Sequence, residues 1–343
     1  MRLGLGIMSV AAVAISFVAP PQEAKAWGEL GHLTVCDLAY RNFTPQTRVA
    51  LDTLFQPRAG GVHIPTSGDQ EGRVYTSFNV GCLEEDERPR KHPKDHFINV
   101  DRWVQAITDG TCPLSPTTGQ PGKCIFEGIE RDLRILKDAT KSRQERVIAL
   151  MAIGHWVGDI HQPLHISYED DAGGNGIDVQ FKGQCGPSRT SSKPYRPGNL
   201  HAVWDNCLLQ NGIFQRVRER QDFKASWGWR TITYRAVDTL KANTSLAQER
   251  SYVASEPWQW AAESYAITRD PGVQYCVMVG TRCQYSATQP ILHDGDAARK
   301  AVVGADYLKA YKDIAGERVA KAGFRLAHLI NLALDPNYTQ PTE

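Results

Sequence analysis

Two His-x-x-x-Asp pairs constrain this chain more than any other feature of its sequence. His155 and Asp159 end a long apolar segment, and His201 and Asp205 lie among apolar and aromatic residues at 199–205. Residues at this spacing leave the same face of a helix, so each pair can converge on one cation. A buried, uncompensated charge is costly, and a shared divalent cation removes that cost. One such pair is usually an ordinary hydrogen-bonded pair, but two of them predict metal binding.

Three further histidines can extend this cluster. His32 and His96 lie in apolar settings, and His165 follows Pro163, which ends the predicted helix and lets His165 point away from the first pair. The remaining histidines have no partner at a spacing that indicates a ligand. We expect them to be structural or on the surface: His63, His92, His161, His293 and His328.

The first 26 residues predict a cleaved signal peptide. Arg2 supplies the positive start, residues 5–19 form a short apolar stretch, and 24–26 (Ala-Lys-Ala) is a small-x-small cleavage site. The alternative is a membrane anchor, but the apolar stretch falls short of the roughly 20 residues that span a bilayer. The sequence therefore predicts a secreted or periplasmic protein, without stable membrane insertion, whose mature chain begins at Trp27.

Eight cysteines, an even number, suit the oxidising compartment that export implies. Short spacing favours Cys112 with Cys124 and Cys276 with Cys283 as local disulfides. Because no Cys-x-x-Cys spacing occurs, we do not interpret the cysteines as metal ligands. The other four could form two longer disulfides, in a pairing that the sequence leaves open: Cys36, Cys82, Cys185 and Cys207.

Composition and periodicity predict one mainly α-helical domain over residues 27–343. With 41% hydrophobic and 22% charged residues, the chain can bury a full core. Residues 177–181 alternate like a strand and are expected to form one arm of a small β-hairpin. Residues 57–73, 110–123 and 183–198 are expected to be loops. The expected helices are two short ones within 33–55, with Thr44 as an N-cap, and others at 125–139, 142–161, 200–210, 231–240, 246–254, 257–268 and 304–334.

Several of these motifs together resemble a known family, the secreted zinc-dependent nucleases that cut single-stranded nucleic acid and remove 3′-phosphates. Its wider superfamily includes the bacterial zinc phospholipases C. The resemblance spans most of the mature chain in order and spacing. It rests on Trp27 with His32, Cys82-x-x-x-Asp86 ahead of 96–99 (His-Phe-Ile-Asn), the run from His155 to His165, Asp171-x-Gly173-Gly174-Asn175, and 199–205.

The resemblance implies a mainly α-helical, single-domain fold of the phospholipase C/nuclease type, with three zinc ions (Zn²⁺) in a cleft. The first zinc would be held by Asp86, His96, His155 and Asp159. The second would be held by the free amine and carbonyl oxygen of Trp27, by His32, and by Asp159 as a bridge. The third would be held by His165, His201 and Asp205. Nitrogen and oxygen ligands without thiolate suit zinc.

The predicted N-terminus has a chemical reason to take part in this site. Cleavage after residue 26 gives Trp27 an α-amine with an unperturbed pKa of roughly 8, so zinc can displace its proton near neutral pH. The amide of an uncleaved chain cannot bind in this way. Signal removal is therefore expected to complete the second site.

The expected activity is endonucleolytic cleavage of single-stranded DNA and RNA to 5′-phosphate products, with 3′-nucleotidase activity. Water between the first two zincs would reach a pKa of about 7 and supply hydroxide, while the third zinc would stabilise the leaving 3′-oxygen. Asp86 would orient the nucleophile. The family places a basic residue three positions after this aspartate, where this chain has Pro89, flanked by Arg88 and Arg90; of these two we favour Arg90 for the role.

The expected substrate contacts lie on either side of the first zinc. Phe97 can stack on a nucleobase and Asn99 can bond its edge; stacking tolerates any base. Phe97 can equally be a core residue beside a ligand. Glu84 and Glu85 are expected to make the rim near the first zinc acidic and less favourable to polyanions. Basic and acidic residues nearly cancel, 39 against 38, so phosphate binding has to come from a local site.

Two other functions remain open at this point. A phospholipase C-like enzyme would keep the fold and hydrolyse lipid phosphodiesters. Against it, those enzymes tend to have glutamate where this chain has Asp205, and a longer gap between the residues matching Trp27 and His32. A secreted protein that binds zinc without turnover would keep the ligands, and Pro89 leaves that reading open.

Overall fold

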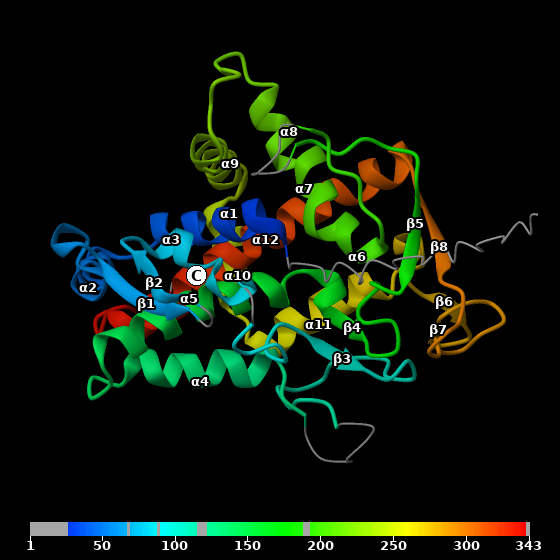
Figure 1. Ribbon diagram of the computed structural model, residues 1–343, viewed down its shortest axis with the longest axis horizontal. Helices are drawn as coiled ribbons and strands as arrows, with labels where there is room; N and C mark the ends of the chain where they lie inside the picture. The colour runs from blue at the N-terminus through cyan, green and yellow to red at the C-terminus, as the bar shows by residue number, and fades with distance from the viewer. Residues whose placement is uncertain (1–26, 67–68, 88–89, 115–121, 188–192, 341–343) are drawn as a thin grey trace, which may run out of the picture.

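The computed structural model describes residues 27–66, 69–87, 90–114, 122–187 and 193–340, so the predicted signal peptide lies outside the described residues. Helices dominate this part of the chain, as the sequence predicts (Figure 1). They are α1 (Gly28–Arg41), α2 (Pro45–Phe55), α3 (Phe78–Gly81), α4 (Ile125–Lys137), α5 (Arg143–Ile160), α6 (Leu200–Ala202), α7 (Leu208–Asn211), α8 (Ile213–Arg218), α9 (Trp229–Asn243), α10 (Leu246–Val253), α11 (Pro257–Thr268) and α12 (Ala305–Leu334).

Helix starts follow the capping signals of the sequence. Thr44 accepts a hydrogen bond from the backbone N–H of Thr47, and Pro45 is the first residue of α2. Ser142 and Glu145 form a reciprocal capping box at the start of α5. Helix α5 ends at Ile160, and Pro163 begins the short 3-10 turn η3 (Pro163–His165). This early stop lets residues after α5 face a different part of the site.

The core is built around α5, which is buried on all sides from residue 149 to its end. A helix that is apolar all round belongs in the interior, and α1 and α12 pack beside it (Figure 1). Two small residues allow close packing on α5. A Cβ on Gly154 would lie 2.5 Å from the Sγ of Cys82, and one on Gly158 would lie 2.6 Å from Nδ1 of His32.

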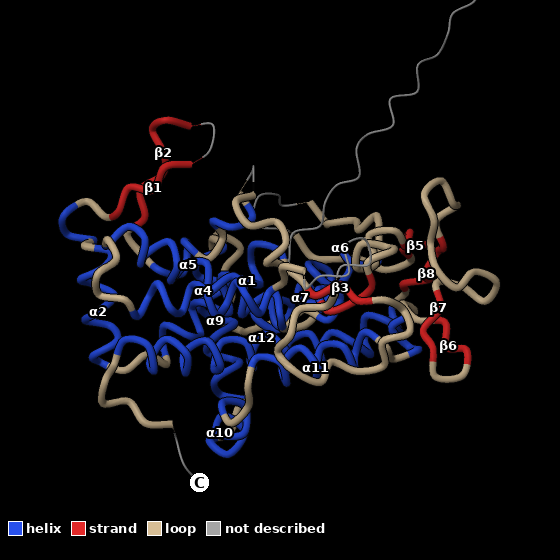
Figure 2. Tube along the Cα trace, turned by 90° about the horizontal axis from the view of Figure 1, so that it is seen from below, coloured by secondary structure: helices blue, strands red, loops and turns tan. Residues whose placement is uncertain are grey.

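Strands pair only in twos among the described residues. β1 (Val62–Thr66) and β2 (Asp69–Tyr75) are antiparallel, as are β6 (Val277–Val279) and β7 (Arg282–Gln284). Two pairs are parallel: β3 (Ile98–Val100) with β4 (Ile166–Tyr168), and β5 (Ile177–Phe181) with β8 (Arg299–Val303). Figure 2 shows the hairpin β1–β2 projecting at one end of the molecule and β5 to β8 at the other.

Two expectations about strands were wrong. Residues 177–181 do form a strand, but its partner is β8, far along the chain and parallel, so it is not an arm of a hairpin. Alternation predicts a strand without identifying its partner. The predicted loop at 57–73 contains β1 and most of β2. Its glycines and Pro65 are turn signals, and the strand signal is short: it consists of Val62 and Ile64, whose side chains are buried on β1.

All eight cysteines form disulfides. The two local pairs, Cys112–Cys124 and Cys276–Cys283, are those that the short spacing favours. The open pairing of the other four is resolved as Cys36–Cys82 and Cys185–Cys207. In the described part of the chain, no helix has both the length and the apolar character that crossing a membrane requires.

Candidate metal centre

Among the described residues, three groups of side chains could each hold a metal ion, with ligand atoms within 4.8 Å of one another. All are buried, and they contain every imidazole and carboxylate that the sequence analysis assigned to zinc. The groups are Asp86, His96 and His155; His32, His155 and Asp159; and His165, His201 and Asp205.

Asp159 connects the first two groups. Its Oδ2 lies 3.0 Å from Nδ1 of His96 and 3.4 Å from Nε2 of His155, while its Oδ1 lies 3.2 Å from Nε2 of His32. His155 and Asp159 come from adjacent turns of α5, as the spacing predicts. One carboxylate therefore faces ligand candidates on both sides, which is the position that a bridging ligand needs.

Packing on α5 places the other members of these two groups. His32 comes from α1 and stacks on His155, with ring centroids 4.0 Å apart, because Gly158 leaves room for its ring. Asp86 ends the 3-10 turn η2 (Glu84–Asp86), and the disulfide Cys36–Cys82 joins the segment before this turn to α1. The disulfide rests on α5 at Gly154.

The third group comes from two other segments. His165 lies in η3 directly before β4, and His96 lies just before β3, the strand that pairs with β4. Nδ1 of His165 donates to the carbonyl of His96 over 2.6 Å. His201 lies in α6, and Asp205 lies in the π-helical turn η4 (Val203–Cys207). The sequence predicts a helix here, and the π turn is a variation typical of functional sites. Oδ1 of Asp205 lies 3.5 Å from Nε2 of His201.

Backbone carbonyls determine which ring nitrogen is free in three of the histidines. Nδ1 of His155 lies 2.8 Å from the carbonyl oxygen of Cys82. Nδ1 of His201 lies 2.6 Å from the carbonyl oxygen of Gly173. His165 makes the same bond to His96. A carbonyl can only accept, so each Nδ1 carries a proton, and in a neutral ring Nε2 presents a lone pair. This is the usual arrangement of a metal-binding histidine. His165 and His201 are neutral at pH 7, whereas His155 has to lose the proton on Nε2 before that atom can bind a metal ion.

The free atoms fit a metal ion. Nε2 of His96, Oδ2 of Asp205 and Nδ1 of His32 are buried without a hydrogen-bond partner. Nε2 of His32 and Oδ1 of Asp159 face each other at 3.2 Å, but without the geometry of a hydrogen bond. Leaving such atoms unsatisfied is costly, and coordination to a cation would satisfy them. Imidazole and carboxylate donors without thiolate suit zinc among the common protein metals.

The electrostatics of the third group prepare it for a cation. Burial lowers the pKa of His165 to about 4 and that of His201 to about 3, so both rings are neutral at pH 7. In contrast, burial raises the pKa of Asp205 well above its usual range, so a cation that binds there has to displace the carboxyl proton. For His155, burial opposes protonation, but the carboxylates of Asp159 and Asp86 outweigh it and raise the pKa to about 9.

Arg90 contacts Asp86 of the first group. Its Nη2 donates to Oδ1 of Asp86 over 2.7 Å, and its side chain is mostly buried. Phe97 and Asn99 are both partly exposed; the Phe97 ring has Nζ of Lys94 at 5.8 Å from its centroid, and Asn99 lies in β3. Pro89 is outside the described residues.

The expectation of an acidic rim was wrong. Glu84 and Glu85 are buried, and each has a basic partner: Lys91 lies 3.3 Å from Glu84, and His92 lies 3.1 Å from Glu85. Glu84 also accepts from the hydroxyl of Tyr75. The 3-10 turn η2 directs these carboxylates into the protein, so the sequence alone could not show that they are compensated.

Trp27 is fully buried at the start of α1, with a positive φ of 24°. Its carbonyl accepts from the N–H of Gly31 over 3.1 Å. The following Gly28 packs against η4, since a Cβ there would lie 3.2 Å from the carbonyl oxygen of Asp205. Trp27 thus lies near the third group and about one helical turn before His32. Its role as a metal ligand stays a prediction.

Sequence reasoning missed Gln162. Its Nε2 donates to Oδ1 of Asp205 over 2.7 Å and lies 3.3 Å from Nε2 of His201, while its Oε1 accepts from the N–H of Leu164. The side chain is fully buried. Its only sequence signal was its position in the 155–165 motif, between Asp159 and His165.

The fold and this cluster define a class: mainly helical proteins in which adjoining groups of buried imidazoles and carboxylates could hold metal ions, an arrangement suited to activating water for hydrolysis. A model of the S1/P1 nuclease family matches residues 27–335, and the chain belongs to that family. It is therefore a nuclease, a hydrolase that acts on phosphodiester bonds.

Named relatives agree with this assignment. Nuclease S1 of Aspergillus oryzae is 25% identical, over 93% of this chain and 96% of its own. Endonuclease 4 of Arabidopsis thaliana is 24% identical, over 90% of this chain and 89% of its own. Endonuclease 2 of the same plant is 26% identical, but that match spans only 60% of this chain and 62% of the relative.

Proposed function

We propose that this chain is a secreted or periplasmic zinc enzyme that cleaves single-stranded DNA and RNA endonucleolytically to 5′-phosphate products and removes the phosphate of 3′-nucleotides. The observation that carries the proposal is the arrangement around α5, where Asp159 faces two groups of ligand candidates and the third group lies beside them. Nδ1 of His165 is 3.9 Å from Oδ2 of Asp159, so the three groups form one continuous cluster.

The proposed ligands follow the three groups. Asp86, His96, His155 and Asp159 would hold the first zinc, and His165, His201 and Asp205 the third. His32 and Asp159 would hold the second, together with the amine and carbonyl of a processed Trp27. When bound, zinc lowers the pKa of water and neutralises charge on phosphate oxygens.

The chain's own residues have distinct parts in the reaction. Asp86 accepts a proton or hydrogen bond from the attacking water and orients it. Arg90 holds Asp86 through its 2.7 Å contact and offsets charge on the phosphate. The neutral rings of His165 and His201 keep their lone pairs available at pH 7, because burial lowers the pKa of each.

Phe97 and Asn99 are the proposed substrate-binding residues. Both are partly exposed next to His96, so a base stacked on Phe97 would lie beside the first group. Single-stranded substrates are favoured because an unpaired base can stack on an aromatic ring, whereas a base inside a duplex cannot reach it.

Export of the protein is supported by its disulfides. Four of them among the described residues are typical of oxidising compartments such as the periplasm or the extracellular space. Residues 1–26 would be removed on export, and the amine so created would complete the second site.

The testing experiment is zinc analysis of the mature protein together with assays of single-stranded DNA, a 3′-nucleotide and a phosphatidylcholine analogue, before and after chelation. We expect hydrolysis of the first two substrates only, lost on chelation and restored by zinc. His201→Asn should lose activity, whereas His293→Asn, at an exposed site outside the three groups, should not.

Other outcomes would select another function. Hydrolysis of the phosphatidylcholine analogue alone would identify a lipid phosphodiesterase. Bound zinc without release of product from any of the three substrates would identify a non-catalytic zinc-binding protein. Either result would overturn the proposal.

A further inference from the structure

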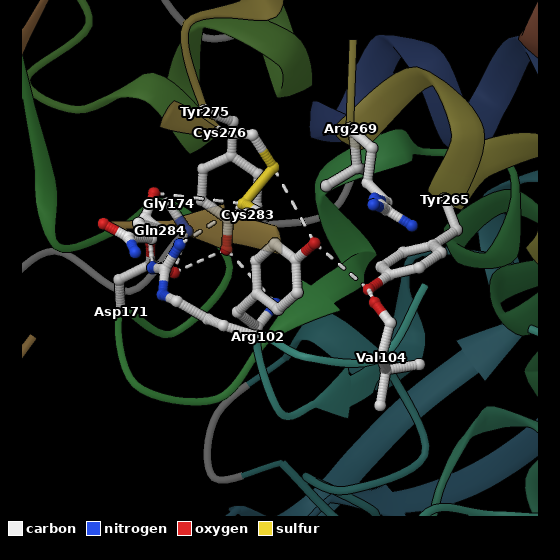
Figure 3. The surroundings of a disulfide bond; sticks show 12 residues. Arg102, Val104, Asp171, Gly174, Tyr265, Arg269, Tyr275, Cys276, Cys283 and Gln284 are labelled. Carbon is white, nitrogen blue, oxygen red and sulfur yellow. Dashed lines mark hydrogen bonds and ion pairs between the residues drawn. A yellow bond between two sulfur atoms is a disulfide. The ribbon is translucent and has the colours of Figure 1, made fainter. Parts of the chain in front are cut away.

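A buried cluster of one arginine and two aspartates lies beside the turn that contacts His201 of the third group. Arg102 follows β3, and its guanidinium reaches the two carboxylates that follow β4. Nε lies 2.7 Å from Oδ2 of Asp170. Nη2 lies 2.6 Å from Oδ2 of Asp171 (Figure 3). Arg102 and Asp171 are 5% and 2% exposed. Neither residue belongs to any of the three metal-binding groups.

The other oxygen of Asp171 holds the turn that follows it. Oδ1 accepts from the hydroxyl of Tyr275 over 2.5 Å and from the N–H of Gly174 over 3.0 Å. The backbone carbonyl of Asp171 accepts from the N–H of Gly176 over 2.9 Å. The carboxylate is thus bonded on both oxygens, and the turn 171–176 folds around it.

This turn has a conformation that few sequences allow. Ala172, Gly173 and Gly174 have φ values of 50°, 70° and 83°, in the left-handed region that favours glycine. A Cβ on Gly173 would also lie 2.6 Å from the carbonyl of Leu164. The turn therefore needs both its glycines and an anchor that holds it in place.

The turn ends in a direct contact with the third group. The carbonyl of Gly173 accepts from Nδ1 of His201 over 2.6 Å, and the N–H of His201 lies 3.4 Å from the carbonyl of Gly174. His165, in contrast, is held by the carbonyl of His96. Of the two third-group rings, only His201 depends on the turn.

We propose that Arg102 and Asp171 are positioning residues for His201: they hold the turn 171–176 so that the carbonyl of Gly173 keeps the proton of His201 on Nδ1 and its Nε2 free for a metal ion. The inference rests on the proposed function in one respect, that His201 binds a metal. Neither positioning residue touches the substrate or the metal.

The surroundings of Arg102 show why this cluster is specific. Its guanidinium carbon lies 4.8 Å from the ring centroid of Tyr168 and 5.5 Å from that of Tyr285, and Nη1 lies 3.6 Å from Sγ of Cys283. The disulfide Cys276–Cys283 closes this side (Figure 3). A planar fork bonded to two carboxylates has its direction fixed, which a lysine cannot reproduce.

The test uses Arg102→Lys and Asp171→Asn in the mature protein, with Arg325→Lys as the matched control. Arg325 is also a buried arginine, bonded to Glu263 and His161, and belongs to none of the three groups. Bound zinc is counted by native mass spectrometry in buffers of defined free zinc, and thermal unfolding is measured alongside. Nitrogen NMR of ¹⁵N-histidine-labelled, zinc-free protein reports the tautomer of His201, whose signals are those missing in His201→Asn.

We expect the two test variants to lose affinity for one ion by about 10- to 100-fold, the range found for residues that orient a metal ligand, while the remaining ions bind as before. The His201 ring should leave its pure Nδ1–H form. In the His201→Asn background, Arg102→Lys should cause no further loss of zinc. The control should lose stability without losing the ion.

Equal weakening of all ions in step with stability, or an unchanged His201 tautomer in both variants, would overturn the inference. A wild-type protein that binds no zinc would overturn the proposed function instead. In that case the tautomer measurement on zinc-free protein still decides whether Arg102 and Asp171 orient His201.

Discussion

Nε2 of His165 lies 3.1 Å from Nε2 of His201, and the Nδ1 of each ring donates to a backbone carbonyl. Neither nitrogen has a proton to give the other, because burial keeps both rings neutral by lowering their pKa values. Two lone pairs therefore face each other at hydrogen-bond distance. This arrangement is unfavourable in itself and becomes favourable when a cation lies against both nitrogens.

Removing metal should therefore destabilise the protein. A ligand that binds only the folded state at 100 times its dissociation constant adds about 2.7 kcal/mol to the free energy of unfolding. We expect Tm to fall on chelation and to rise with the logarithm of free zinc, as followed by thermal denaturation in zinc buffers. A Tm independent of free zinc would contradict the prediction, and His201→Asn should show a weaker dependence.

Gly158→Ala should displace His32. The added Cβ would meet Nδ1 of His32 at 2.6 Å, and the stacking of His32 on His155 limits where its ring can move. Overpacking of this kind costs about 1–3 kcal/mol. We expect denaturant unfolding to show this decrease in the free energy of unfolding, and zinc analysis to find one ion fewer per chain. Gly110→Ala adds the same methyl group in open space, in a loop, and should change neither quantity. A Gly158→Ala protein with full zinc content would contradict the displacement of His32 from a metal site.

One extra residue before Trp27 should abolish binding at the second site. The extension replaces the α-amine with an amide, which cannot lose its proton to zinc near neutral pH. We expect zinc analysis to find one ion fewer and the nuclease assay to find little activity. A matched chain beginning with Phe in place of Trp27 keeps the amine and should keep the ion. Unchanged zinc content in the extended chain would refute the role of the terminus.

The helical fold and the convergence of each His–Asp pair could be predicted because both depend on local rules, whereas the clustering of all the ligand candidates was expected only from the resemblance to a family. Ser142 with Glu145 starts α5, and the spacing of His155 and Asp159 places both on one face of it. Contacts between distant segments could not be predicted. The partner of β5 and the orientation of Glu84 and Glu85 depend on packing, and Gln162 carries no spacing signal.

Glu263→Gln should lower stability at neutral pH and have no effect in strong acid. Glu263 bonds Arg325 over 2.7 Å and also contacts Arg318; burial opposes its ionisation, but these two arginines outweigh it and lower its pKa from 4.5 to about 2. The folded state therefore holds the proton less tightly than the unfolded state. The resulting stability is present above pH 4.5 and is lost as the pH falls toward 2.

Because the Glu263 side chain is 34% exposed, we expect Glu263→Gln to lower the free energy of unfolding at pH 7 by only about 1–2 kcal/mol. Urea unfolding of both proteins at several pH values measures the difference, which should shrink below pH 4.5. Glu130→Gln, at an exposed pair with Arg134, should show none; a Glu263→Gln difference that stays constant with pH would mean that the carboxylate acts through packing and not through its charge.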